Sequence, residues 1–225
     1  MFLLKYYSIF GNLIPVIAGL LFKTYNHKIL KSVFYLYVWY FIYTSVLKIY
    51  AKLYHNNMFM VRYYALVEIF FLSYYFYQVF ETKFKKQISF TGFLLFIIFL
   101  ACDLIYGDIK QSPNYLMAFT GVLYTVYSFI VLYQFFTKNE TDDLLTIPNF
   151  WIVSSILVFF GGTFILWLFS RLFLIESRVN KSLGVFQLVE VFETFNYIGM
   201  VIGFWKQKKM NEAQPKINKN TNLRI

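Results

Sequence analysis

Charged residues are scarce in this chain. Asp, Glu, Lys and Arg together make up 14% of its 225 residues, and the mean hydropathy is +0.56. A soluble globular domain carries about 25% charged residues. The missing charge leaves long apolar blocks separated by short polar segments, which is typical of a multi-pass membrane protein. We therefore expect an integral membrane protein, with the lipid bilayer as its main partner.

Residues that build disulfides and metal sites are also nearly missing. Cys102 is the only cysteine, so no disulfide can form within the chain. The two histidines, His27 and His55, lie between apolar blocks, and no metal-ligand spacing is visible around them. The sequence therefore predicts no metal site and no cofactor.

Seven apolar blocks are long enough to cross a bilayer. A hydrocarbon core of about 30 Å needs about 20 residues in a helix. The blocks do not alternate in polarity as the strands of a membrane β-barrel do, so the predicted fold is all-α with seven transmembrane helices. The expected spans are residues 6–22, 33–50, 58–80, 88–106, 115–136, 150–175 and 182–205.

The predicted organisation is one transmembrane domain over residues 1–205, followed by a disordered basic tail over residues 206–225. The net charge of +10 would suggest nucleic acid as a partner of a soluble protein. Here the Lys and Arg residues lie in short loops and in the tail, where they set membrane topology. Their distribution predicts an outside N-terminus and an inside C-terminus, and we expect no nucleic-acid partner.

Three glutamates fall inside the predicted spans: Glu68 in the third, and Glu190 and Glu193 in the seventh. A charged side chain that faces lipid costs roughly 2.5 to 3.5 kcal/mol, so these carboxyls are expected inside the helix bundle. Gln187, Thr194 and Tyr197 share a helical face with Glu190 and Glu193 and complete the list of candidates on the seventh span. Such groups serve proton relays, cation sites or ligand anchors; alternatively they hydrogen-bond neighbouring helices and fix their packing.

A short sequence match links the two spans. Residues 66–70 (LVEIF) correspond to residues 188–192 (LVEVF), and a tyrosine follows each matched glutamate seven positions later, Tyr75 in one case and Tyr197 in the other. The matched glutamates lie at similar depth. The match predicts a polar ligand or proton site between the third and seventh helices.

Three further charged residues lie near span ends. Arg62 is expected at the outer end of the third span, Asp103 at the outer end of the fourth, and Arg171 near the outer end of the sixth. Asp103 is a suitable ion-pair partner for either arginine, and the alternative is that the arginines extend to the membrane surface.

A real repeat would divide the chain into the first three and the last three helices, joined by the fourth. Seven helices with an outside N-terminus in this 3+1+3 plan resemble the SWEET and PQ-loop transporters in topology, which implies transport. The Pro-Gln pair of that family is absent, so no residue role is carried over. The chain is also similar in composition to seven-helix membrane proteins of unassigned function in AT-rich bacteria such as the Bacteroidota. A rhodopsin would need a Lys in the middle of the seventh helix, and none is there.

Three functions remain open. The first is a small-solute or proton/cation-coupled transporter with its site between the third and seventh helices. The second is a seven-helix receptor or sensor subunit that binds a small ligand and signals to a separate cytoplasmic protein, which would dock on the loops at residues 24–31, 81–87 and 137–148. The third is an intramembrane enzyme with paired carboxyls, although no nucleophile–base or metal-ligand spacing supports catalysis. A structural membrane subunit is the remaining alternative.

Overall fold

The computed structural model of the chain describes residues 2–54, 58–108, 111–138, 143–169 and 184–213. Within these ranges the fold is all-helical, with seven α-helices and two short 3-10 helices. The α-helices are α1 (Phe2–Leu21), α2 (Leu30–Tyr54), α3 (Met58–Val79), α4 (Lys83–Tyr106), α5 (Asn114–Lys138), α6 (Pro148–Leu168) and α8 (Gly184–Ala213). The 3-10 helices are η1 (Thr24–Asn26) and η2 (Leu144–Thr146).

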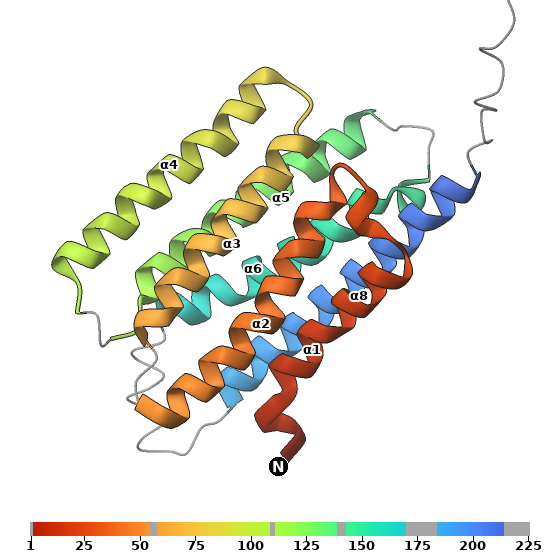
Figure 1. Cartoon of the computed structure of the whole chain (residues 1–225). Helices are drawn as coiled ribbons and strands as arrows, with labels where there is room; N and C mark the ends of the chain where they lie inside the picture. Colours follow the sequence, from red (N-terminus) through yellow and green to blue (C-terminus); the bar gives the residue numbers. More distant parts are fainter. Residues whose placement is uncertain (1, 55–57, 109–110, 139–142, 170–183, 214–225) are drawn as a thin grey trace, which may run out of the picture.

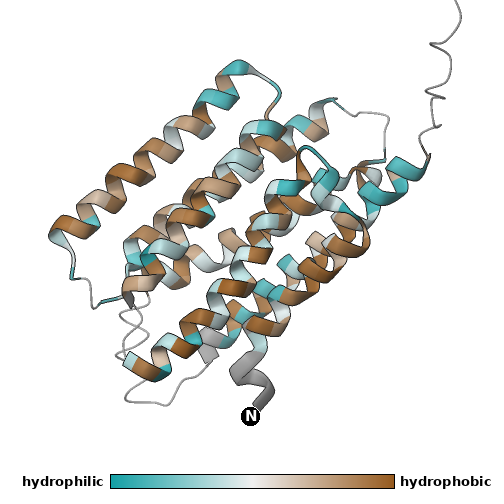
Figure 2. Cartoon of the chain, viewed as in Figure 1, coloured by the Kyte–Doolittle hydropathy of each residue, from teal (hydrophilic) through white to brown (hydrophobic). Residues whose placement is uncertain are grey.

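Four of the α-helices, α2, α4, α5 and α6, are long and apolar enough to cross a membrane. Apolar residues dominate the middle of α4 and more hydrophilic ones lie toward its ends (Figure 2). Large apolar side chains of α4 such as Leu95, Ile98 and Phe99 are exposed on the surface of the bundle. Extended apolar surface of this kind fits contact with lipid, so these helices indicate a membrane protein.

The helices run alternately up and down the bundle (Figure 1). We call the end that holds Phe2, Tyr54 and Met58 the N-terminal end, because α1 begins there. The helices α3, α5 and α8 also begin at this end, and α2, α4 and α6 finish there. We call the opposite end, with Leu21 and Leu30, the C-terminal end.

Six helices close a ring. In the order α1, α2, α3, α5, α6, α8, each helix contacts the next, and α8 returns to α1. The helix α4 stands outside this ring and packs on α3 and α5 (Figure 1). In the ring α3 and α8 are three places apart in either direction. The two helices that carry the candidate glutamates therefore face each other across the centre of the bundle.

Local signals set where several helices begin. The Nδ1 atom of His27 accepts a hydrogen bond from the backbone N–H of Leu30 at 3.3 Å, which caps the start of α2. Burial lowers the pKa of His27, which favours the neutral ring that can accept this bond. The hydroxyl of Thr82 accepts from the N–H of Lys85 at 3.3 Å and caps α4 in the same way. Pro148 occupies the first turn of α6, where its missing N–H costs nothing.

Two glycines let α8 approach α6 closely. A Cβ atom at Gly203 would lie 2.5 Å from Ile152 Cγ1, and one at Gly199 would collide with Ser155 Cβ. Gly199 and Gly203 are four residues apart, so they lie on the same face of α8. Small residues with this spacing are the common device for close helix packing in membranes. This contact fixes how far α8 is rotated and therefore which of its side chains face the ring centre.

We expect Gly199→Ala to lower the free energy of unfolding by about 1 kcal/mol, the low end of the cost of overpacking, because one methyl group is the smallest addition. The matched control is Gly161→Ala in α6, since a Cβ there would meet its nearest neighbour, Thr125 Oγ1, at an ordinary 3.7 Å. The control should be neutral or stabilising, because alanine favours helix over glycine by up to about 1 kcal/mol. Unfolding of the two variants in detergent measures the difference; equal effects would contradict the proposed packing.

Several helices extend beyond the apolar blocks of the sequence. The helix α4 begins at Lys83 rather than at residue 88, and α8 continues past Trp205 to Ala213, so residues 206–213 of the predicted tail are helical. Extending an existing helix adds one hydrogen bond per residue fixed, whereas starting one is costly. Lys209 Nζ also lies 4.0 Å from the ring centre of Trp205. Residues 170–175 of the predicted sixth span and residues 214–225 lie outside the described residues.

Candidate functional site

A cavity of about 240 Å³ lies at the centre of the ring. Every ring helix contributes to its lining, including Tyr40 from α2, Glu68 from α3, Thr120 from α5, Thr163 from α6 and Glu193 from α8. A space with polar side chains on several walls and aromatic rings between them is typical of a small-molecule site.

The cavity lies in the half of the bundle nearer the N-terminal end. Leu47, Val61 and Trp167, which are close to that end, belong to its lining. Toward the C-terminal end the core contains fully or almost fully buried apolar side chains, among them Ile152 and Phe204. The two halves of the bundle thus differ: a cavity with polar walls in one and apolar packing in the other.

Glu68 is the most buried acid of the cavity, with 1% of its surface exposed. Its Oε1 accepts a hydrogen bond from the hydroxyl of Tyr40 at 2.5 Å. The Tyr40 ring stacks on Tyr64, with ring centroids 5.0 Å apart, and this stacking holds the hydroxyl in place. The second carboxyl oxygen, Oε2, is buried and has no hydrogen-bond partner among the described residues. One oxygen of this carboxyl is therefore bonded within the protein, and the other is buried beside the cavity with its hydrogen-bonding capacity unused.

Three further polar atoms around the cavity are, like Glu68 Oε2, buried without a hydrogen-bond partner in the described part of the chain. They are the hydroxyls of Tyr37 and Tyr43 and the Oδ1 of Asn196. All three residues line the same cavity as Glu68. Because buried polar groups in proteins are normally hydrogen-bonded, several open groups around one space indicate a place for a polar ligand or for water.

Glu193 approaches the cavity from the opposite wall. Its Oε2 accepts a hydrogen bond from the hydroxyl of Tyr197 at 3.3 Å, one helical turn away on α8. The ring of Tyr197 packs edge-on against Tyr37, with centroids 6.1 Å apart. Gly11 of α1 lies directly against the Tyr197 ring and leaves no room for a Cβ atom. The helices α1 and α2 thus hold the tyrosine that positions this second carboxyl.

The sequence match between α3 and α8 is only half represented in the cavity. Glu68 and Tyr197 line it, whereas Glu190 and Tyr75 do not. The hydroxyl of Tyr75 donates to Asn149 Oδ1 at 3.2 Å, away from the cavity. The acid of α8 that lies opposite Glu68 is therefore Glu193, almost one turn beyond the matched Glu190.

The other two candidates on α8 are exposed. Gln187 lies on the surface, and Thr194 is exposed as well. The Thr194 hydroxyl donates to the backbone carbonyl of Glu190 at 2.8 Å and also hydrogen-bonds the hydroxyl of Tyr7. Since α8 contacts α1 on one side and α6 on the other, only part of its polar face is turned to the cavity.

Sequence reasoning missed the contribution of α2. Tyr37, Tyr40, Tyr43 and Thr44 all line the cavity, although no candidate was named on this helix. A signal was present, because tyrosines at positions i, i+3 and i+6 lie on one helical face. The high content of Tyr and Phe throughout the chain hid this pattern.

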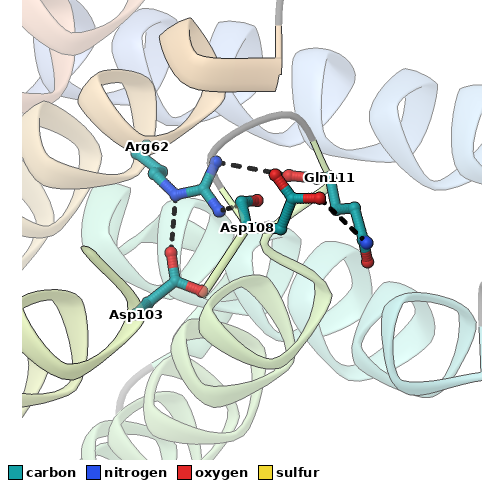
Figure 3. A network of polar contacts seen from close by, with 4 residues as sticks. All are labelled: Arg62, Asp103, Asp108 and Gln111. Carbon is teal, nitrogen blue, oxygen red and sulfur yellow. Dashed lines mark hydrogen bonds and ion pairs between the residues drawn. The ribbon is translucent and has the colours of Figure 1, made fainter. Parts of the chain in front are cut away.

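Arg62 and Asp103 form an ion pair near the N-terminal end, in which the arginine is buried and the aspartate is partly exposed (Figure 3). Arg62 is 3% exposed, and its Nε donates to Asp103 Oδ2 at 2.6 Å. Its two terminal nitrogens donate to the backbone carbonyls of Gln111 and Asp108, each at 3.2 Å. The arginine therefore joins α3 to the end of α4 and to the loop before α5. Arg171, the other candidate partner of Asp103, lies outside the described residues.

No known protein family, curated protein or solved structure matches this chain. The topological resemblance to the SWEET and PQ-loop transporters, like the compositional resemblance, thus stays a prediction.

Proposed function

We propose that this membrane protein is a carrier for a small solute, coupled to or selective for protons or other cations, with its binding site in the cavity between α3 and α8. The observation that carries the proposal is the buried carboxyl of Glu68 in the cavity wall, bonded to Tyr40 on one oxygen and without a hydrogen-bond partner among the described residues on the other. Ionisable groups inside a membrane are costly, and they mark substrate and ion pathways when they face a cavity.

The order of helices in the ring supports a carrier. Helices that lie three places apart in the ring form three pairs: α1 with α5, α2 with α6, and α3 with α8. The two helices of each pair run in the same direction along the bundle (Figure 1). This is the relation that the 3+1+3 repeat requires, with α4 as the linking helix outside the ring. Carriers built from two repeats bind their substrate between them and alternate access by moving one repeat against the other.

The unequal halves of the bundle fit one state of such a cycle. The cavity lies toward the N-terminal end, and apolar side chains fill the core toward the C-terminal end. In the proposed cycle this apolar packing opens when the N-terminal half closes. With the outside N-terminus that the lysine and arginine distribution predicts, the cavity would face the outside in this state.

Two-sided labelling tests the cycle without knowledge of the solute. In a Cys102→Ala background, single cysteines at Thr44 in the cavity and at Ile152 in the apolar packing are exposed to a membrane-impermeant maleimide from either side of sealed vesicles. A carrier predicts labelling of Thr44→Cys from the N-terminal side and of Ile152→Cys from the C-terminal side. A cysteine at Phe70, which is 57% exposed on the apolar surface of α3, is the control and should react from neither side.

The alternative is a receptor or sensor subunit, and the one-sided cavity is the observation that favours it. Such a protein needs a ligand site at one end and a surface for a separate cytoplasmic protein at the other. Labelling of the cavity cysteine from the N-terminal side, with the apolar packing unreactive from both sides under all conditions, would contradict the carrier and support the sensor.

A further inference from the structure

The lining of the cavity has a clear charge preference. It contains two carboxylates, Glu68 and Glu193, and no Lys, Arg or His among the described residues. Of these two acids Glu68 is the more deeply buried, with 1% of its surface exposed. It is thus the acid of the cavity that a positive charge would stabilise most, since an isolated buried carboxylate is strongly disfavoured.

The unpaired polar atoms include two hydrogen-bond acceptors, the carboxylate Oε2 of Glu68 and the Oδ1 of Asn196, whereas the hydroxyls of Tyr37 and Tyr43 can accept or donate. A ligand that satisfies Glu68 Oε2 and Asn196 Oδ1 brings N–H or O–H donors. A positive charge together with N–H donors describes a protonated amine better than a quaternary ammonium ion, which has no N–H.

Aromatic rings form much of the remaining wall. Tyr64, Phe160, Trp167 and Tyr197 come from α3, α6 and α8 and line the same space. The faces of such rings attract organic cations and also pack well against an apolar body. The two acids come from opposite walls of the cavity, Glu68 from α3 and Glu193 from α8, and these rings lie in the walls with them.

Size and ligand count argue against larger solutes and against a bare metal ion. The cavity of about 240 Å³ is below the range of roughly 300 to 1,000 Å³ usual for ligand pockets. No three His, Cys, Asp or Glu side chains are grouped to hold a metal ion in the described ranges. Calcium and magnesium bind about six or more oxygen ligands, which this donor set does not offer from charged groups.

From these observations we infer that the cavity binds a small organic ammonium ion, with its N–H groups on Glu68 Oε2 and Asn196 Oδ1 and its apolar body between the aromatic rings. The inference rests on the proposed function, because it names the class of solute that the carrier would take. Glu68 is the charge anchor, and Tyr40 is a positioning residue that holds the carboxyl through Oε1.

Three probes of nearly the same shape test the inference: benzylamine, which is positively charged at neutral pH, the neutral benzyl alcohol, and the anion benzoate. Binding to the purified full chain in lipid nanodiscs is measured by calorimetry. We expect saturable binding of benzylamine at least tenfold tighter than that of the alcohol, and no binding of benzoate. Equal binding of amine and alcohol, or displacement of benzylamine by sodium chloride as effectively as by a second amine, would overturn the inference.

Single substitutions test whether Glu68 and Asn196 bind the amine. Glu68→Gln should weaken benzylamine binding at least tenfold and Asn196→Ala by a smaller factor. In each variant the binding of benzyl alcohol should fall by a smaller factor than that of the amine, because the alcohol brings one O–H donor and no charge. Glu190→Gln is the matched control on α8, since its side chain does not line the cavity; it should bind benzylamine as the parent does. A thermal unfolding scan of each variant identifies misfolded protein, and Asn196→Ala keeps the test valid where Glu68→Gln does not fold. Unchanged amine binding in folded Glu68→Gln would contradict the anchor.

The binding experiment tests the class of ligand, and the labelling experiment tests the carrier, so each proposal can be contradicted without the other. Amine binding with cysteine labelling from one side only would remove the carrier and keep the ligand class, now for a sensor. Labelling from both sides without amine binding would keep the carrier and remove the ammonium ligand.

Discussion

Replacing Arg62 by methionine should lower the free energy of unfolding by about 3 kcal/mol, the low end of the usual result of removing one partner of a buried ion pair, because Asp103 is partly exposed. The side chains of Arg62 and Asp103 are 4% and 22% exposed, and Asp103 would keep its charge without the guanidinium that now contacts it at 2.6 Å. Two loop carbonyls, those of Asp108 and Gln111, would lose their donor at the same time. Chemical unfolding in detergent, followed by circular dichroism, measures the loss.

Lys138→Met is the matched control. Lys138 and Glu81 form an ion pair of similar length, 2.8 Å, but their side chains are 65% and 45% exposed. An exposed pair contributes about 0 to 1 kcal/mol, so this variant should lose little stability. If both variants lost the same free energy of unfolding, the contacts of Arg62 would stabilise the fold no more than an exposed ion pair does. A double variant, Arg62→Met with Asp103→Leu, should recover much of the loss, because no uncompensated charge remains.

Tyr40→Phe is expected to lower the free energy of unfolding by about 1.5 to 3 kcal/mol, the typical contribution of a hydrogen bond to a charged group. The ring and its stacking on Tyr64 stay, and only the hydroxyl that donates to Glu68 at 2.5 Å is lost. Glu68 Oε1 would then lose the hydrogen bond from Tyr40, while Oε2 is already buried without a hydrogen-bond partner in the described residues. The same unfolding assay measures the effect.

Tyr43→Phe provides the comparison on the same helix. The Tyr43 ring also packs on Tyr64, with centroids 5.0 Å apart, but its buried hydroxyl has no partner in the described residues. Its removal should therefore be nearly neutral for stability. Equal losses for Tyr40→Phe and Tyr43→Phe would show that the hydroxyl of Tyr40 does not stabilise Glu68.

The positions of the helices could largely be predicted from the sequence, because each apolar block has the length of a bilayer crossing. The third block, predicted at residues 58–80, corresponds to α3 at Met58–Val79. Helix ends were predicted less well, since polar residues such as Lys83 or Lys208 can extend a helix into water without an apolar signal. The inside or outside location of each end is still a prediction from charge alone.

The composition of the cavity was harder to predict, because it depends on how helices rotate against one another. The contact between Tyr40 and Glu68 joins two helices, and no local pattern links the two positions. The choice between Glu190 and Glu193 on α8 is decided by its packing on α6 through Gly199 and Gly203. The sequence places both acids on one broad face, and only the packed bundle selects between them.

The contacts of Arg62 were likewise predictable only in part. Pairing with Asp103 was among the expected contacts, because both residues were placed at the same membrane surface. The backbone carbonyls of Asp108 and Gln111 complete the surroundings of the guanidinium (Figure 3). Loop conformation brings them there, and the residue types of the loop carry no signal for it.

A cryo-EM structure of the full chain in a lipid nanodisc, at a resolution that shows ordered water, would test whether Glu68 serves the cavity as a binding group. We expect Glu68 bonded to Tyr40 through one carboxyl oxygen, with the other oxygen in contact with water or a ligand in a cavity shared with Glu193 and Asn196. A Glu68 side chain paired with a basic residue, or a ring centre filled by apolar side chains, would contradict it.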